Sequence, residues 1–124
     1  MKIKTNEASG PALDWMVAKC EGWEFKPNPH RFDSSPILSK DGLDNLWFNG
    51  YKPSKDWSQG GTIIERENVT GLQKSKHLGT GDVLWHCFID NSNFQVGPTP
   101  LIAAMRCYCA SKLGDEVEVP EELQ

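Results

Sequence analysis

The strongest constraint on the fold is a pair of apolar segments near opposite ends of the chain, each carrying helix start and stop signals. The first begins at Ser9-Gly10-Pro11, where Ser9 or Gly10 can cap a helix and Pro11 suits a first turn whose amide has no partner. Gly22 supplies a stop signal. The spacing between these signals predicts one buried helical stripe, formed by Leu13, Met16, Val17 and Cys20.

The second segment opens with Gly97-Pro-Thr-Pro100 and ends at Gly114. Thr99 can cap a helix and Pro100 suits its first position, so a helix is predicted over Leu101–Leu113. Its apolar stripe predicts docking on a sheet and consists of Ile102, Met105, Cys109 and Leu113, widened by Leu101 and Tyr108.

The residues between these helices favour short strands. Leu46–Phe48 and Thr62–Glu65 have strand composition. The strongest strand candidate is Asp82–Asp90, which is apolar on both faces and is therefore expected to be central and covered on both sides. Residues 23–45 predict a long loop with one short strand around Trp23–Phe25, and residues 68–78 predict a polar loop or hairpin tip.

We therefore expect a single α+β domain over residues 1–114, in which a small, mostly antiparallel sheet is packed by an N-terminal and a C-terminal helix. Residues 115–124 form an acidic tail with five acids and no base. This tail is expected either to be mobile or to extend the edge of a sheet.

Charge and composition limit the class of protein. With 38% hydrophobic residues and no apolar run of the roughly 20 residues that span a bilayer, a membrane protein is not expected. The first residues lack the apolar segment of a signal peptide, so a cytoplasmic location is expected. Without the tail the chain is nearly neutral, which argues against general nucleic-acid binding but allows a basic pocket for a small anion.

The four cysteines contain no Cys-x₂-Cys pair, and in a reducing compartment core thiols are favoured over disulfides or a zinc site. On a helix Cys107 and Cys109 would point about 200° apart, too far to share one metal ion. We therefore expect neither a metal nor another cofactor.

The segment Pro53–Glu67 combines charge, an aromatic side chain and two glycines in a predicted turn before a strand. The indole of Trp57 could stack on a ligand and Asp56 could accept a hydrogen bond from a ribose or base donor. Arg66 and the amides of Gly60 and Gly61 could bind phosphate. The structural alternative is a turn with a partly buried tryptophan.

Two further residues could bind an anion. Thr99 lies at a predicted helix N-terminus, where free amides and the helix dipole attract negative charge, although the threonine could simply cap its own helix. Arg106 lies two turns into that helix and could pair with a carboxylate on the sheet or remain solvated.

Glu65 and Glu67 are two residues apart on the predicted strand and would share one face. Such a pair could bind a divalent ion or act in acid–base catalysis. An exposed strand edge with cross-strand ion pairs explains the same pattern.

The chain resembles the NinX family of small tailed-phage proteins, whose function is unknown. The resemblance rests on Met1-Lys-Ile-Lys-Thr5 with Ala12-Leu-Asp-Trp-Met-Val-Ala-Lys19, on Pro53-Ser-Lys-Asp-Trp-Ser-Gln-Gly-Gly-Thr-Ile-Ile-Glu-Arg-Glu67, and on Gly97-Pro-Thr-Pro-Leu-Ile-Ala-Ala-Met-Arg106 with Ala110-Ser-Lys-Leu-Gly-Asp-Glu-Val117. It spans most of the chain. It implies a phage accessory protein that acts in the infected bacterium, and it implies no catalytic residue.

These observations favour a non-enzymatic binder of a small anionic or nucleotide-like ligand, which in a phage would sequester a nucleotide-derived immune signal of the host. A homo-oligomer is also expected, because one small domain encloses little volume. One alternative is a protein-interaction module that inhibits or redirects a host enzyme through the Trp-rich surface and the acidic tail. Another is a nucleotide hydrolase centred on Asp56, Glu65 and Glu67.

Overall fold

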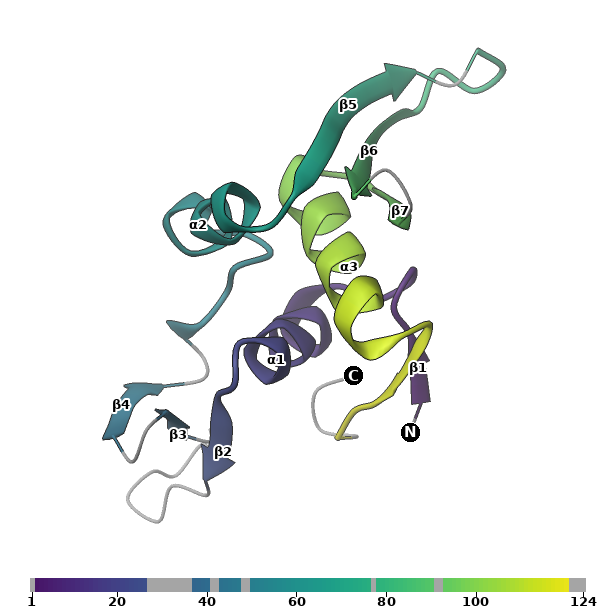
Figure 1. Cartoon of the computed structure of the whole chain (residues 1–124). Coiled ribbons are helices and arrows are strands. Elements are labelled where there is room, and N and C mark those ends of the chain that lie inside the picture. Colours follow the sequence, from purple (N-terminus) through teal and green to yellow (C-terminus); the bar gives the residue numbers. More distant parts are fainter. Residues whose placement is uncertain are drawn as a thin grey trace.

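Three helices and eight short strands make up the part of the chain that a computed structural model describes, namely residues 2–26, 37–40, 43–47, 50–76, 78–90 and 93–120 (Figure 1). In chain order the elements are β1 (Lys2–Lys4), α1 (Gly10–Cys20), β2 (Glu24–Lys26), β3 (Ile37–Lys40), β4 (Leu43–Trp47), α2 (Trp57–Arg66), β5 (Val69–Lys76), β6 (Val83–Ile89), β7 (Asn93–Gly97), α3 (Pro100–Leu113) and β8 (Glu116–Glu118).

The α+β class is confirmed, but the strands form three antiparallel sheets instead of one. Strand β1 pairs with β8, β2 to β4 form a meander, and β5 to β7 form a second meander. Helix α3 contacts both the β5–β7 sheet and β8 (Figure 1). It therefore lies between the β5–β7 sheet and the β1–β8 pair.

Helix α3 is buried on two sides. One side packs on β6 and β7, where the Cys107 thiol lies 3.5 Å from the carbonyl of Cys87 and 3.3 Å from that of Asn93. The other side packs on α1, where Cys109 lies beside Cys20. The expected docking of α3 on a sheet is therefore correct, and the two cysteines of α3 do point to opposite sides. All four thiols are free.

Helix α1 begins and ends where the sequence predicts. Its burial is wider than one stripe, because every residue from Ala12 to Ala18 is buried, including Asp14 and Trp15. Packing explains the difference: α3 covers one side, and the Asp14 carboxylate accepts a hydrogen bond from the Ser54 amide at 2.9 Å on another. The helix docks mainly on α3 and not on the predicted sheet.

The prediction of a strand at Thr62–Glu65 is wrong, because these residues belong to α2. Asp56 caps this helix by accepting the Ser58 amide at 2.9 Å. The sequence does carry this signal: Asp56 followed three residues later by Gln59 is the pattern of a capping box. The strand propensity of the two β-branched isoleucines was preferred to this helix signal, but Ile63 is buried as part of the helix.

The β5–β7 sheet contains the largest departures from the sequence interpretation. Residues 69–76, predicted as a polar loop, form β5, and β7 was not predicted. A polar strand such as β5 is stable here because β6 satisfies its backbone groups along seven paired positions. Strand β6 is central as expected, but it is not covered on both sides: Val83 and Leu84 are 42% and 37% exposed.

Two other regions contain more strand than expected. The strand predicted around Trp23–Phe25 is β2, and the predicted loop also contains β3 and most of β4. The strand predicted at Leu46–Phe48 is β4, which begins earlier, at Leu43; Phe48 lies outside the described residues. A composition rich in Pro and Asp predicts a loop, whereas the strands here form because each pairs with a neighbouring strand.

The start of the acidic tail extends the edge of a sheet. Strand β8 pairs with β1 in register, with Val117 opposite Ile3, and Val117 and Val119 are buried in the core. The buried Thr5 hydroxyl lies 3.2 Å from the Gly114 carbonyl, which ties the two ends together. Among the described residues, no helix is both long enough and apolar enough to span a membrane.

Candidate functional site

The N-terminal ends of α2 and α3 open onto a shared groove, which we call the interhelical groove. Its volume is about 310 Å³. It is lined by Ser54, Lys55, Trp57, Thr99, Pro100, Leu101 and Ile102.

Asp56 caps α2 beside the groove and does not line it. Its Oδ1 accepts the Ser58 hydroxyl at 2.6 Å and the Ser58 amide at 2.9 Å. These two hydrogen bonds hold the pKa of Asp56 below its usual value. The carboxylate therefore stays ionised, and its primary role is to begin the helix that carries Trp57.

Thr99 caps α3 in the same way, with its hydroxyl accepting the Ile102 amide at 3.1 Å. Pro100 follows at the first helical position, where the missing amide costs no hydrogen bond. The self-capping role considered for Thr99 is therefore the one observed. The cap also fixes the direction in which the α3 N-terminus faces the groove.

Gly60 allows α2 to pack directly against Pro53 and Leu101. A Cβ atom at this position would meet the Pro53 carbonyl oxygen at 2.3 Å and a methyl carbon of Leu101 at 2.7 Å. No other residue type fits without displacing backbone. The close approach predicted for this glycine is thus to the protein itself. Gly61 has more room, since its nearest neighbour would be the Trp57 ring at 3.7 Å.

Gly97 performs a similar role at the end of β7. A Cβ atom there would lie 2.7 Å from the amide nitrogen of Ala103 and 3.0 Å from a methyl carbon of Ile102. The glycine allows the strand to end against the first turn of α3. Two close contacts, at Gly60 and Gly97, therefore set the position of α3 relative to α2 and to the sheet.

Beneath the groove lies a buried polar contact between α1 and the segment that precedes α2. Asp14, only 4% exposed, accepts the Ser54 amide. Burial raises the pKa of Asp14, while the hydrogen bond from the Ser54 amide and the charges of Lys55 and Lys52 oppose the rise. The Ser54 side chain is 2% exposed, and within the part of the chain that the structure describes its hydroxyl forms no hydrogen bond of good geometry. A buried hydroxyl without a partner is available to a ligand that reaches it.

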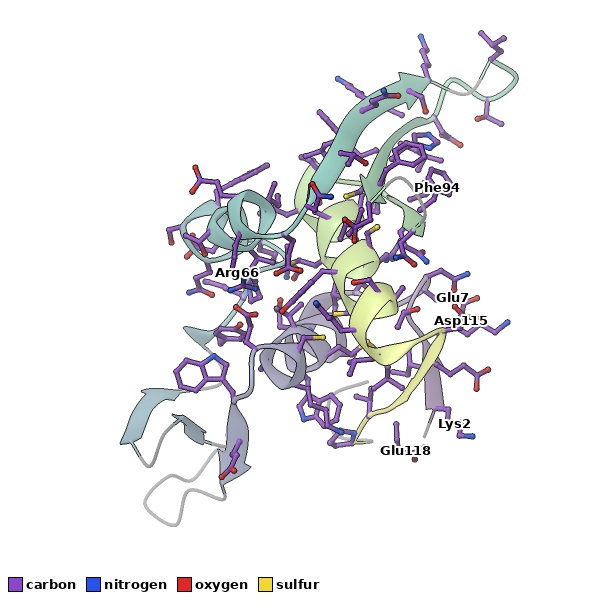
Figure 2. The ribbon with its side chains drawn as sticks, viewed as in Figure 1. Lys2, Glu7, Arg66, Phe94, Asp115 and Glu118 are labelled. Carbon is purple, nitrogen blue, oxygen red and sulfur yellow. The ribbon has the colours of Figure 1, made fainter. Side chains whose placement is uncertain are left out.

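Arg66 lies at the other end of α2, away from the groove. Its guanidinium donates to the two carboxylate oxygens of Glu21 at 2.9 and 2.6 Å, and to Glu67 at 3.0 Å (Figure 2). It also contacts the Tyr108 hydroxyl at 3.2 Å. The hydrogen bonds to Glu21 raise the pKa of Arg66. Its donors are used to fasten α2 to α1 and α3, so it does not share a site with Trp57.

Arg106 is also committed to the protein. Its Nε donates to the Ala8 carbonyl at 2.7 Å and a terminal nitrogen donates to the Val96 carbonyl at 2.9 Å. Burial lowers the pKa of Arg106, and the charge of Glu7 opposes this. The side chain bridges the loop before α1 and strand β7. These backbone carbonyls, and not the sheet carboxylate considered from the sequence, are its hydrogen-bond acceptors among the described residues, and the side chain is only partly exposed to solvent.

The acids proposed for hydrolysis do not meet. Because 57–66 is a helix, Asp56 and Glu67 lie at its opposite ends, about 16 Å apart along the axis at 1.5 Å per residue. Glu65 lies in the helix and Glu67 just after it, so they do not share a strand face, and Glu67 pairs with Arg66 and Lys112. Among the described residues, no group of three His, Cys, Asp or Glu side chains could hold a metal ion.

Of the predicted site residues, the structure brings together Trp57 and Thr99 in the lining of the groove, while Gly60 packs on Pro53 and Leu101 and Asp56 caps α2 beside it. Gly61 faces the Trp57 ring, and the two arginines lie elsewhere. The sequence interpretation missed Lys55 and Ser54. Both belong to the Pro53–Glu67 segment, and the lysine next to Asp56 was a signal that could have been used.

The same segments decide the family. The chain matches the protein family described as bacteriophage P22 NinX over residues 4–112. It belongs to this NinX family. The match covers most of the chain, including α1, α2 and all of α3 except its last residue, and it confirms the resemblance inferred from the sequence. The chain is therefore a phage protein. No curated protein matches it.

Within this NinX-family chain, the interhelical groove is built from the two longest of the three segments that carry the resemblance. Trp57 and Lys55 come from Pro53–Glu67, and Thr99 comes from the segment that begins at Gly97. The groove thus joins two motifs that are 30 or more residues apart in the sequence.

Proposed function

We propose that this NinX-family protein binds a small anionic, nucleotide-like ligand in the interhelical groove and holds it without chemical change. The observation that carries the proposal is the convergence of two helix N-termini, Lys55 and an exposed tryptophan on one groove. In the phage this binding would sequester a nucleotide-derived signal of host immunity.

The charges around the groove support an anionic ligand. The dipoles of α2 and α3 both place partial positive charge there, and amides in a first helical turn have no carbonyl partner within their own helix. Of the described residues that line the groove, Lys55 alone is charged. A phosphate group would therefore meet a lysine and two helix ends, and none of these lining residues is an acid that would repel it.

The other side chains support an attached base. Trp57 is 54% exposed, which is high for a tryptophan, and it lies beside the apolar side chains of Leu101 and Ile102. An indole stacks on the face of any base. A volume of about 310 Å³ is at the small end for ligand pockets. The groove suits one nucleotide unit, so a larger ligand would extend beyond it.

Binding is favoured over hydrolysis by what lines the groove. Among the described residues that line the groove, none is Asp, Glu, His or Cys, so the lining offers no carboxylate, imidazole or thiol as a general base. The Ser54 hydroxyl is present, but its neighbour Asp14 already accepts the Ser54 amide. A hydroxyl in this position is better placed to donate a hydrogen bond to a ligand than to attack it.

The first test is to mix the purified protein with lysate from bacteria whose nucleotide-based defence is active, wash it, denature it by heat and identify the released molecules by mass spectrometry. We expect an intact nucleotide from the wild type. Lys55→Ala and Trp57→Ala should release much less, whereas Lys52→Ala, a lysine close by but outside the lining, should release as much as the wild type.

Two results would reject the proposal. Release of degraded nucleotides only, with turnover in a purified assay, would make the chain an enzyme. If nothing is released, and calorimetric titration detects no binding of nucleoside monophosphates, cyclic dinucleotides or inorganic phosphate, the ligand-binding proposal is rejected. The protein-interaction alternative is then favoured.

That alternative now needs a different test from removal of the whole acidic tail. Deleting residues 115–124 would remove Val117 and Val119 from the core and would unfold part of the molecule. Substituting the exposed Glu116 and Glu118 by Gln leaves the core intact. Loss of a host partner from this variant, with ligand binding unchanged, would support a contact role for the acidic segment.

A further inference from the structure

Strand β6 has apolar side chains on both faces, but the described residues cover only one of them. Cys87 and Ile89 point toward α3 and are buried. Leu84, His86 and Phe88 alternate with them and point away from α3. A strand with this composition is normally buried on both faces.

The register of the sheet defines the uncovered surface, which we call the outer face. Phe88 lies opposite Gly71 on β5 and Phe94 on β7, and His86 lies opposite Gln73 and Val96. Directly opposite residues share a face of the sheet. The outer face consists of Gly71, Gln73, Ser75, Leu84, His86, Phe88, Phe94 and Val96.

The aromatic rings of the outer face are held in place. The ring centroids of Phe88 and Phe94 are 5.0 Å apart, and His86 stacks on Phe94 at 5.4 Å with 28° between the ring planes. A Cβ atom on Gly71 would lie 3.2 Å from the Phe88 ring, so the glycine leaves room for it. Phe94 is still 46% exposed and projects from β7 (Figure 2). A rigid, exposed aromatic cluster loses little side-chain entropy when it is covered.

The lack of charged residues on the outer face limits what can cover it. None of its eight residues is Asp, Glu, Lys or Arg. A nucleic acid is disfavoured, because no cation is present to neutralise phosphate. A second copy of the same surface is favoured, because a two-fold interface brings each patch onto its own copy, and a patch without charged residues then buries no unpaired charge. The depletion of charge and the enrichment in aromatic residues are those of an interface core.

We infer that the outer face of the β5–β7 sheet packs on the outer face of a second copy of this chain, forming a two-fold dimer. The two sheets would stack face to face at about 10 Å, as in a β-sandwich. The β5–β6 hairpin extends beyond α3 (Figure 1). The inference is independent of the ligand proposed for the interhelical groove.

The test compares two neighbouring residues of β6. Leu84 lies on the outer face and is 37% exposed, whereas Val83 lies on the other face and is 42% exposed. We expect sedimentation velocity of the wild type to show a dimer at tens of micromolar. Leu84→Asp and Phe94→Asp should weaken the dimer at least tenfold, while Val83→Asp should leave it unchanged. Circular dichroism of each variant checks that it is folded.

A measurement on the unmodified protein covers the case in which a variant does not fold. On dilution of the wild type, the NMR signals of the Phe88 and Phe94 rings should move with the monomer–dimer equilibrium, while those of the buried Trp15 should not. The inference is overturned if the wild type is monomeric at one millimolar, or if Val83→Asp disrupts the dimer as much as Leu84→Asp. It is equally overturned if a labelled single-stranded oligonucleotide binds the wild type and is lost in Phe94→Asp.

Discussion

Arg66 and Glu21 form a bidentate ion pair that joins the end of α2 to the end of α1, with nitrogen–oxygen distances of 2.9 and 2.6 Å. The Tyr108 hydroxyl from α3 donates to the same Glu21 carboxylate at 2.5 Å. Three helices therefore meet at one carboxylate. The pair fixes the C-terminal end of α2, while the Gly60 contact fixes its N-terminal part.

Arg66→Ala is expected to lower the free energy of unfolding by about 1–2 kcal/mol. Charge-assisted bidentate hydrogen bonds are among the stronger polar contacts, but Arg66 is 50% exposed and solvent weakens the pair. Urea denaturation measures the loss. Lys112→Ala, which removes a single contact to Glu67 at 3.6 Å from a residue of similar exposure, should cost under about 0.5 kcal/mol. Equal costs for the two variants would contradict this reading of the Glu21 cluster.

Gly60→Ala and Gly61→Ala should change stability in opposite directions. At Gly60 the new methyl group would overlap the Pro53 carbonyl, and overpacking of this kind costs about 1–3 kcal/mol. At Gly61 there is room, and alanine in a helix should add about 0.5–1 kcal/mol. Thermal unfolding of the two variants gives both signs. A stable Gly60→Ala variant would mean that α2 does not lie against Pro53.

Asp14 and Asp56 should affect the pH dependence of stability in opposite directions. Burial raises the pKa of Asp14 in the folded state, so its contribution to stability is complete below the unfolded pKa near 3.8 and is lost as pH rises through the folded value. Hydrogen bonds from Ser58 lower the pKa of Asp56, so its contribution is present above 3.8 and is lost as pH falls through the folded value.

Urea denaturation between pH 2.5 and 7 separates the two groups. The stability of the wild type minus that of Asp14→Asn should fall as pH rises, and the stability of the wild type minus that of Asp56→Asn should rise. Asparagine keeps the hydrogen-bond acceptor at each position, and it is as good a helix cap as aspartate, so the comparison isolates the charge. Parallel curves for the two variants would show that one assignment is wrong.

Trp57→Ala should lower the affinity for the nucleotide-like ligand by about tenfold or more, because base stacking on an aromatic side chain contributes about 1–3 kcal/mol. Trp57→Phe should retain most of the affinity. The exposed indole contributes little to the core, so both variants should melt close to the wild type. Calorimetric titration checks the affinities. Unchanged affinity in Trp57→Ala would place the ligand away from the interhelical groove.

The ends of α1 and α3 could be predicted to within about a residue from the capping residues, the proline at the start of each helix and the apolar spacing. These signals act within one or two turns, and Thr99 caps α3 whatever else the chain does. The same local reasoning failed at Ile63 and Ile64, where strand propensity was preferred to the Asp56 cap. It failed again at β5, a strand whose polar residues gain their stability from pairing with β6.

The candidate site could be predicted only in part. Trp57 and Thr99 do meet at one groove, as a common cleft between the two motifs would require. Arg66 and Arg106 were assigned to the same ligand because they are cationic and close in sequence to the motif residues. Each instead donates to protein oxygens that only the folded chain supplies, at Glu21, Ala8 and Val96.

The sequence by itself determined the family, the α+β class and the ends of α1 and α3. It also showed that Pro53–Glu67 combines an aromatic side chain with two glycines. The tertiary structure decided the division into three sheets, the helical state of 57–66 and the exposure of one face of β6. It also decided the partners of both arginines. The physical reason is range: caps and periodicity are satisfied by neighbours in sequence, whereas Arg66 finds Glu21 across 45 residues and Arg106 finds Ala8 across 98. A charged side chain is free for a ligand only when no such partner lies within its reach.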